Sequence, residues 1–118
     1  MYDRDIIRRI LREGLNLFKP IQWRNNKEFL EKLFELLPGN LTPEWDTGVF
    51  GINAWIEGRD GLLFNITQYQ GEGGSFIVYL ENAIIETIID AEIFEGLTIK
   101  TMDEILKYIT SKLNDLEK

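Results

Sequence analysis

Residues 47–94 read TGVFGINAWIEGRDGLLFNITQYQGEGGSFIVYLENAIIETIIDAEIF, and apolar side chains recur there at every second position. This is the period of a β-strand, in which successive side chains point to opposite faces. Three alternating runs are separable, with the inward-facing residues Phe50, Ile52, Ala54 and Ile56, then Leu62, Phe64 and Ile66, then Phe76, Val78 and Leu80. The runs predict an antiparallel meander with one face in the core.

The pattern also constrains the turns between these runs. Opposed residues of antiparallel strands share a face, so bringing Ile56 and Leu62 to the core face requires an odd number of loop residues. A three-residue loop, Arg59, Asp60 and Gly61, meets this condition, with Gly61 in the left-handed conformation. The same parity predicts an odd loop within the glycine-rich residues 71–74. We do not interpret that loop as phosphate-binding, because residues 75–80 predict a strand where a helix would be needed.

Residues 83–94 fit a helical period and a strand period equally well. Five isoleucines, a threonine and a phenylalanine in this segment favour a strand, because β-branched and aromatic side chains suit a pleated surface. In that strand one face is expected to carry Ile85, Thr87, Ile89, Ala91 and Ile93. The opposite face is expected to carry Glu86, Asp90 and Glu92 with Ile84 and Ile88.

Helical patterns lie on both sides of the predicted sheet. Asp3 is expected to cap a first helix that ends at Lys19 and Pro20, and Asn25 with Glu28 forms a capping box for a second. The dipeptide at 42–43, Thr-Pro, predicts a short helical turn, with Trp45 covering an edge of the core.

Thr101 and Glu104 form another capping box. The apolar stripe that follows consists of Met102, Ile105, Leu106, Ile109, Leu113 and Leu116. The predicted fold class is therefore α+β: two N-terminal helices, a four-stranded antiparallel β-meander and a C-terminal amphipathic helix packed on one sheet face. We expect a single domain, residues 1–118.

Charge and composition narrow the classes of function. The net charge is −7, and residues 33–99 hold eleven acids against Arg59 alone. A negative field of this kind disfavours a nucleic-acid partner and favours a basic protein. The chain has no histidine and no cysteine, which removes the usual triads, dyads and most zinc or iron sites. We therefore expect a non-enzyme without cofactor or metal. The N-terminal residues predict no signal peptide or membrane span, so the cytoplasm is the expected location.

The second face of the predicted sheet is the best candidate for a site. It carries Asn53, Trp55, Asn65, Thr67, Tyr69, Ile77 and Tyr79, and exposed aromatics beside amides and acids are typical of protein interfaces. The hypothesis is an immunity or inhibitor protein that neutralises a basic toxin or enzyme by steric occlusion. Its expected partner-binding residues are Trp55, Tyr69, Glu72, Tyr79, Glu81, Glu86, Asp90 and Glu92.

Two alternatives remain open. An acidic secretion-type chaperone predicts a homodimer with a hydrophobic groove. A small carboxylate enzyme or ligand-binding domain predicts convergent acids with a raised carboxyl pKa, and its candidates are Glu81, Glu86, Asp90, Glu92 and Glu95.

Overall fold

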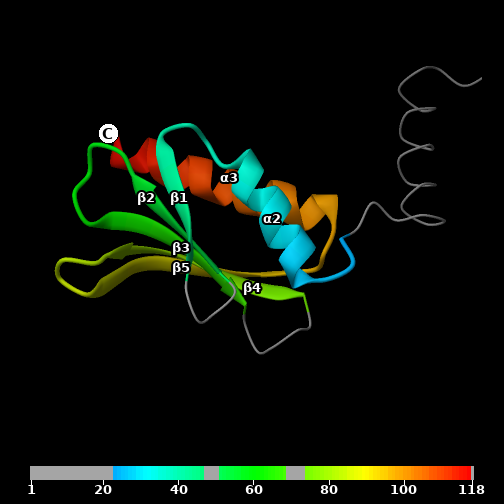
Figure 1. Ribbon diagram of the computed structural model, residues 1–118. Helices are drawn as coiled ribbons and strands as arrows, with labels where there is room; N and C mark the ends of the chain where they lie inside the picture. The colour runs from blue at the N-terminus through cyan, green and yellow to red at the C-terminus, as the bar shows by residue number, and fades with distance from the viewer. Residues whose placement is uncertain (1–22, 47–50, 69–73, 118) are drawn as a thin grey trace, which may run out of the picture.

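The computed structural model describes residues 23–46, 51–68 and 74–117. In chain order the elements are α2 (Asn26–Leu36), β1 (Leu41–Asp46), β2 (Gly51–Ile56), β3 (Leu62–Gln68), β4 (Ser75–Asn82), β5 (Thr87–Glu95) and α3 (Ile99–Leu116). The strands form one antiparallel sheet in the order β1-β2-β3-β4-β5, which is a meander, and both helices lie on one face of it (Figure 1). The α+β class is confirmed, while the first predicted helix lies outside the described residues.

The sheet has one strand more than the sequence predicted. The expected helical turn at Thr42 and Pro43 is wrong, because these residues belong to β1, which pairs with β2 from Leu41 opposite Ile56 onward. Proline is tolerated in this strand since β1 is at the edge of the sheet. The buried side chain of Leu41 anchors the strand on the core.

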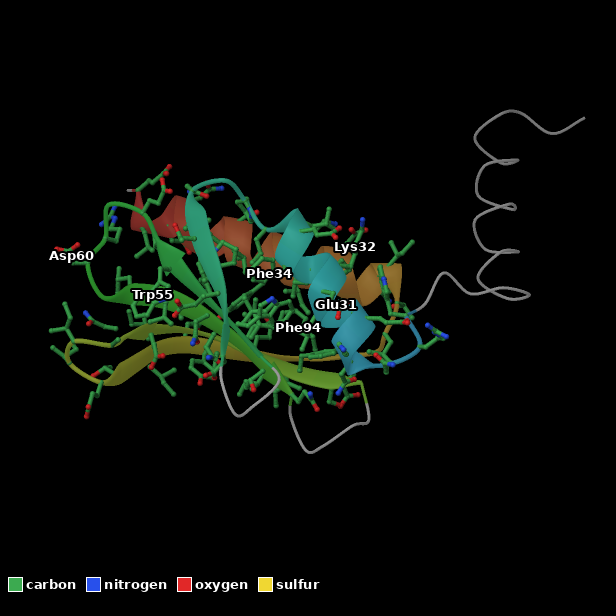
Figure 2. The ribbon with its side chains drawn as sticks, viewed as in Figure 1. Glu31, Lys32, Phe34, Trp55, Asp60 and Phe94 are labelled. Carbon is green, nitrogen blue, oxygen red and sulfur yellow. The ribbon has the colours of Figure 1, made fainter. Side chains whose placement is uncertain are left out.

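The core lies between the sheet and the two helices (Figure 2). The ring of Phe29 on α2 stacks on Phe76 of β4 with centroids 4.6 Å apart. At the β1 side, Trp45 covers the margin of the core by stacking on Phe34, with centroids 4.7 Å apart. The inward-facing residues predicted for β2, β3 and β4 that the structure describes are confirmed as core, apart from Leu62, which is only partly buried.

The β2–β3 hairpin confirms the predicted parity but not the predicted loop. Ala54 lies opposite Phe64, so the turn is centred on Arg59, one position earlier than expected. Gly61 is left-handed as predicted, with φ 79°, but Gly58 is also left-handed, with φ 76°. This wider turn lets the Arg59 guanidinium donate a hydrogen bond to the carbonyl of Leu116, close to the C-terminus of α3, where a cation is favourable.

The predicted N-cap is confirmed for α2 but is wrong for α3. Asn25 caps α2 as expected, its side-chain oxygen accepting from the Glu28 amide at 2.9 Å. The N-cap of α3 is Thr98, not Thr101, and it accepts from the Thr101 amide at 3.2 Å. Thr101 is instead a buried residue within α3, and its hydroxyl donates a hydrogen bond to the Glu95 carbonyl at 2.9 Å. The apolar stripe of α3 is confirmed on the core side.

Residues 87–95 are a strand, as favoured. The expected separation of Asp90 and Glu92 from Ala91 and Ile93 is confirmed, but Ile88, which was expected with the acids, lies opposite Glu81 on the other side. Asp90 and Glu92 lie opposite Leu80 and Val78, on the side that the helices cover. Buried Phe94, opposite Phe76, fixes this register, and a bulge between Leu80 and Glu81 shifts the alternation at the start of the strand. Ile88 and Ile93, opposite Glu81 and Ile77, therefore lie on the other side of the sheet.

Candidate interaction surface on the uncovered sheet face

The outer face is the side of the sheet turned away from α2 and α3, and no described helix covers it (Figure 1). The strand register arranges its side chains in three rows that run from β1 to β5. These rows are Thr42, Trp55, Leu63, Glu81 and Ile88; Glu44, Asn53, Asn65, Tyr79 and Ala91; and Asp46, Gly51, Thr67, Ile77 and Ile93.

The β1–β2 side of the outer face is acidic and aromatic. The Trp55 indole donates a hydrogen bond to the Glu44 carboxylate at 2.8 Å, so cross-strand neighbours hold the ring in one orientation. Asp46 lies in the row next to that of Glu44, and Glu81 lies on β4 in the same row as Trp55. The three rows contain no lysine or arginine, so the described outer face presents negative charge only.

A buried amide lies at the centre of the outer face. Asn65 is only 6% exposed, and its amide nitrogen donates to the Asn53 side-chain oxygen at 2.6 Å. The side-chain oxygen of Asn65 accepts no hydrogen bond from any described residue. A donor that reached this oxygen would relieve a cost of about 1–3 kcal/mol.

Tyr79 is the next residue in the row of Asn65. Burial raises the pKa of its hydroxyl, and the negative charges of Glu81 and Asp46 raise the pKa further. The hydroxyl therefore stays protonated at neutral pH and remains a hydrogen-bond donor.

The β5 side of the outer face is apolar and exposed. We define the isoleucine patch as the exposed isoleucines of the β4–β5 turn and of β5, which are Ile84, Ile85, Ile88, Ile89 and Ile93 and are between 47% and 69% exposed. The register places Ile88 and Ile93 of this patch on the outer face. The sequence pattern grouped Ile88 with Asp90 and Glu92, because it does not reveal the bulge between Leu80 and Glu81.

The structure brings together three of the eight residues expected to bind a partner. Trp55, Tyr79 and Glu81 share the outer face. Glu86 lies in the β4–β5 turn with a positive φ of 52°. Asp90 and Glu92 point to the helix side. The remaining two, Tyr69 and Glu72, lie outside the described residues.

Asp90 is bound within the fold. It accepts a hydrogen bond from the Tyr108 hydroxyl at 2.5 Å and lies 3.3 Å from the Lys112 ammonium. The Tyr108 hydrogen bond is the main cause that lowers the pKa of Asp90, with a smaller effect of Lys112. Burial, assisted by Asp90, raises the pKa of Tyr108. A carboxylate that is held ionised in this way differs from a general acid, whose pKa is raised.

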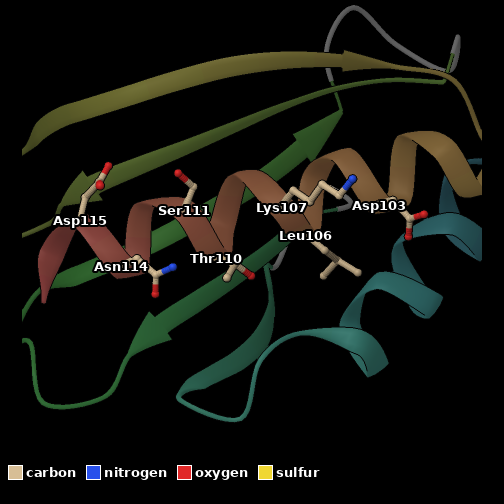
Figure 3. Close-up of a pocket in the computed structure, with 7 residues that line it drawn as sticks. All are labelled: Asp103, Leu106, Lys107, Thr110, Ser111, Asn114 and Asp115. Carbon is tan, nitrogen blue, oxygen red and sulfur yellow. The ribbon is translucent and has the colours of Figure 1, made fainter.

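A shallow depression follows the solvent side of α3 (Figure 3). Its carboxylates, Asp103 and Asp115, lie at opposite ends (Figure 3). At 1.5 Å rise per residue they are roughly 18 Å apart, too far to cooperate as an acid and base across one bond. Among residues 23–46, 51–68 and 74–117, no group of three or more acidic residues is arranged to hold a metal ion.

No protein-family model, curated protein or solved structure matches this chain. Its function therefore has to be inferred from its own residues. None of the helices in the described part of the chain has the length and apolar character needed to cross a membrane.

Proposed function

We propose that this protein is a small acidic protein-binding module that engages a basic protein through the outer face. Within that class we propose an immunity or inhibitor protein, which neutralises a cationic toxin or enzyme by covering its active site. It would act in the cytoplasm of the cell that it protects. The observation that carries the proposal is the outer face itself, which no described helix covers. Its described rows combine oriented Trp55, the exposed Ile88 and Ile93, and negative charge without a lysine or arginine.

Charge supplies the selectivity in this proposal. Glu44, Asp46 and Glu81 lie on the outer face with no basic residue among its rows. Such a surface speeds the approach of a positively charged protein and repels nucleic acids and other acidic surfaces. Glu44 and Asp46 lie on β1, whereas the exposed isoleucines lie at the β5 side, so charge can guide association while apolar burial supplies affinity.

The affinity would come from a few anchors. The hydrogen bond between Trp55 and Glu44 holds the indole in place, so little side-chain entropy is lost when it binds. The isoleucine patch adds exposed apolar area, and large exposed apolar patches usually mark interaction sites. A donor from the partner could also satisfy the buried oxygen of Asn65.

The isoleucine patch favours one second candidate. An acidic secretion-type chaperone that dimerises through its sheet would bury the same side chains, and it would form a stable dimer before it meets a client. Among the described residues no contact favours a carboxylate enzyme, since the pKa of Asp90 is lowered by Tyr108.

A capture experiment with three baits tests the proposal. The wild-type protein, a Glu44→Gln/Glu81→Gln variant and a Glu31→Gln/Glu117→Gln variant are immobilised and exposed to the native lysate at low and moderate salt. Both variants lose two charges, but only the first pair lies on the outer face, since Glu31 is on α2 and Glu117 caps α3. We expect a basic protein that the wild type and the helix variant retain and that the outer-face variant retains about tenfold less well.

The captured protein is then purified and assayed. The proposal expects its activity to be abolished by one equivalent of this chain and restored by moderate salt, which screens surface charge. Equal capture by both variants, an unaffected activity, or no capture by the wild type would contradict it. A dimer that captures acidic or neutral clients would support the chaperone instead.

A further inference from the structure

Strand β5 has one backbone edge that pairs with no other described strand. It is the last strand of the sheet and pairs with β4 alone among the described strands. The bulge beside Ile88 and Ile89 interrupts the start of the strand, so the regular part of the edge is 90–95. An open edge of this kind presents free amide and carbonyl groups on which another chain can add a strand.

The side chains along this edge alternate in chemistry. Asp90 and Glu92 point to the helix side, where they line an open groove with Glu104 and Lys107 of α3. Ala91 and Ile93 point to the outer face, where both are exposed. A strand added beside β5 would place its own alternate side chains opposite these two sets.

We infer that the edge 90–95 accepts an extended segment of a basic protein as an additional strand. In that segment, basic residues lie opposite Asp90 and Glu92, and apolar residues lie opposite Ala91 and Ile93. The inference rests on the proposed function and deepens it, because it names the sequence pattern that the partner has to present.

Charge decides between this partner and a second copy of the chain. Two copies that pair their β5 strands antiparallel about a two-fold axis keep the same face on the same side. With Ala91 opposite its own copy, for example, Asp90 of one copy lies opposite Glu92 of the other. Like charges that are directly opposed destabilise a strand pair, whereas alternating basic residues convert the same positions into favourable pairs.

Glu92 is the acid that a partner would engage most strongly. Asp90 is already held by Tyr108 and Lys112. Glu92, by contrast, forms no salt bridge with a described residue, and its side chain belongs to an exposed position of the strand. Removing the charge of Glu92 should therefore weaken the binding of a basic segment more than removing the charge of another exposed acid does.

Synthetic peptides test strand addition directly. The probe is acetyl-Lys-Val-Lys-Val-Lys-Val-Lys-amide with a fluorescent label, and its control has the same composition with the lysines in one block and the valines in another. Two further versions are N-methylated, one at every valine and one at every inner lysine. Each modification blocks hydrogen bonding along one edge of the peptide strand, since successive amides point to opposite edges.

We expect the alternating peptide to bind about tenfold more tightly than the block peptide, which corresponds to about 1.4 kcal/mol of binding free energy. One N-methylated version should keep this affinity and the other should lose it, because only one edge of the peptide meets β5. Glu92→Gln should weaken binding about fivefold, whereas Glu31→Gln should change it less than twofold.

Three results would overturn the inference. Equal binding of both N-methylated peptides would mean that charge alone attracts them. Equal effects of Glu92→Gln and Glu31→Gln would place the peptide elsewhere. A dimer in sedimentation that Ile93→Lys dissociates would assign the edge to a second copy. If these occur while the outer-face bait variant still loses its captured partner, strand addition fails and the proposed function stands. If that capture fails too, both are wrong.

Discussion

The two faces of one sheet follow different rules in this protein. On β4, Phe76 points to the helices and is fully buried, whereas its neighbour Ile77 points to the outer face and is only partly buried. On β3, fully buried Phe64 adjoins Asn65, whose side-chain oxygen accepts no hydrogen bond from the part of the chain that the structure describes. The helix side is packed for stability, while the outer face keeps apolar and polar groups that the described fold does not satisfy. The difference indicates where a partner would bind.

Truncation of the packed face should have the largest effect. Phe76 is fully buried and stacks on Phe29, so Phe76→Ala should lower the free energy of unfolding by about 3–5 kcal/mol. The adjacent substitution Ile77→Ala should cost about 1 kcal/mol, because part of that side chain stays in water in the native state. Urea denaturation of both variants checks the contrast, and equal losses would show that the outer face is covered as well.

The link between α3 and the edge strand should have a smaller effect. Tyr108→Phe removes the hydrogen bond to Asp90 and should cost about 0.5–1 kcal/mol near neutral pH, reduced from the usual value because Asp90 is partly exposed. Phe keeps the ring packing on Phe94, so the loss reports the hydroxyl alone. A cost like that of Phe76→Ala would mean that the ring itself had moved.

The same variant should change the pH dependence of stability. The pKa of Asp90 is lowered from its ordinary value of 3.8, mainly by the Tyr108 hydroxyl, so its contribution is present above that value and is lost as the pH falls through the folded-state pKa. The pKa of Tyr108 is raised from 10.0 by burial and by Asp90, so ionisation of the unfolded tyrosine destabilises the protein above pH 10.

Thermal unfolding across the pH range distinguishes the wild type from Tyr108→Phe. The variant should lose less stability on acidification, and it should lack the Tyr108 part of the alkaline decline. Superimposable profiles, merely displaced in temperature, would show that the Tyr108–Asp90 contact does not control either titration.

Replacing the buried amide of the outer face should raise the free energy of unfolding, whereas the preceding substitutions lower it. Asn65→Val removes an acceptor that has no donor among the described residues and introduces a side chain that suits a strand. The variant should unfold at a higher urea concentration, because its free energy of unfolding rises by about 0.5–1 kcal/mol. It should nevertheless capture the basic partner less well. Destabilisation would show that the Asn53 hydrogen bond matters more than the unsatisfied oxygen.

The smallest effect on stability should come from the isoleucine patch. Ile93 is 47% exposed, so Ile93→Ser should change the free energy of unfolding by less than about 0.5 kcal/mol. It should nevertheless weaken partner capture, and the matched change Ile99→Ser at the start of α3, 38% exposed, should not. Parallel urea titrations and capture assays measure both quantities, and a loss of capture in the Ile99 variant would contradict the assignment to β5.

Local periodicity predicted most of the fold. Alternation found β2, β3 and β4, and helical spacing found α2 and α3, because in each case one face is buried. The strand β1 was missed because Thr42 and Pro43 have the local pattern of a helix start, while their pairing with β2 is a long-range contact. The N-cap of α3 was missed because Thr98 and Thr101 are both suitable caps, and only the bond from Thr101 to the Glu95 carbonyl decides between them.

The candidate site was harder to predict than the fold. Trp55, Tyr79 and Glu81 could be grouped from strand parity alone. The orientation of β5 could not, because it depends on a bulge and on the burial of Phe94. Acids in that segment were therefore expected on the surface that the isoleucines occupy.

Amide hydrogen exchange, measured on the free protein and on its complex with the captured basic partner, tests the outer face as a binding surface most directly. The account predicts slower exchange on complex formation in β4 and β5, residues 75–95, with the largest change along the open edge at 90–95, and unchanged exchange in α2. Protection confined to α2 and the solvent side of α3, with the sheet unchanged, would contradict it.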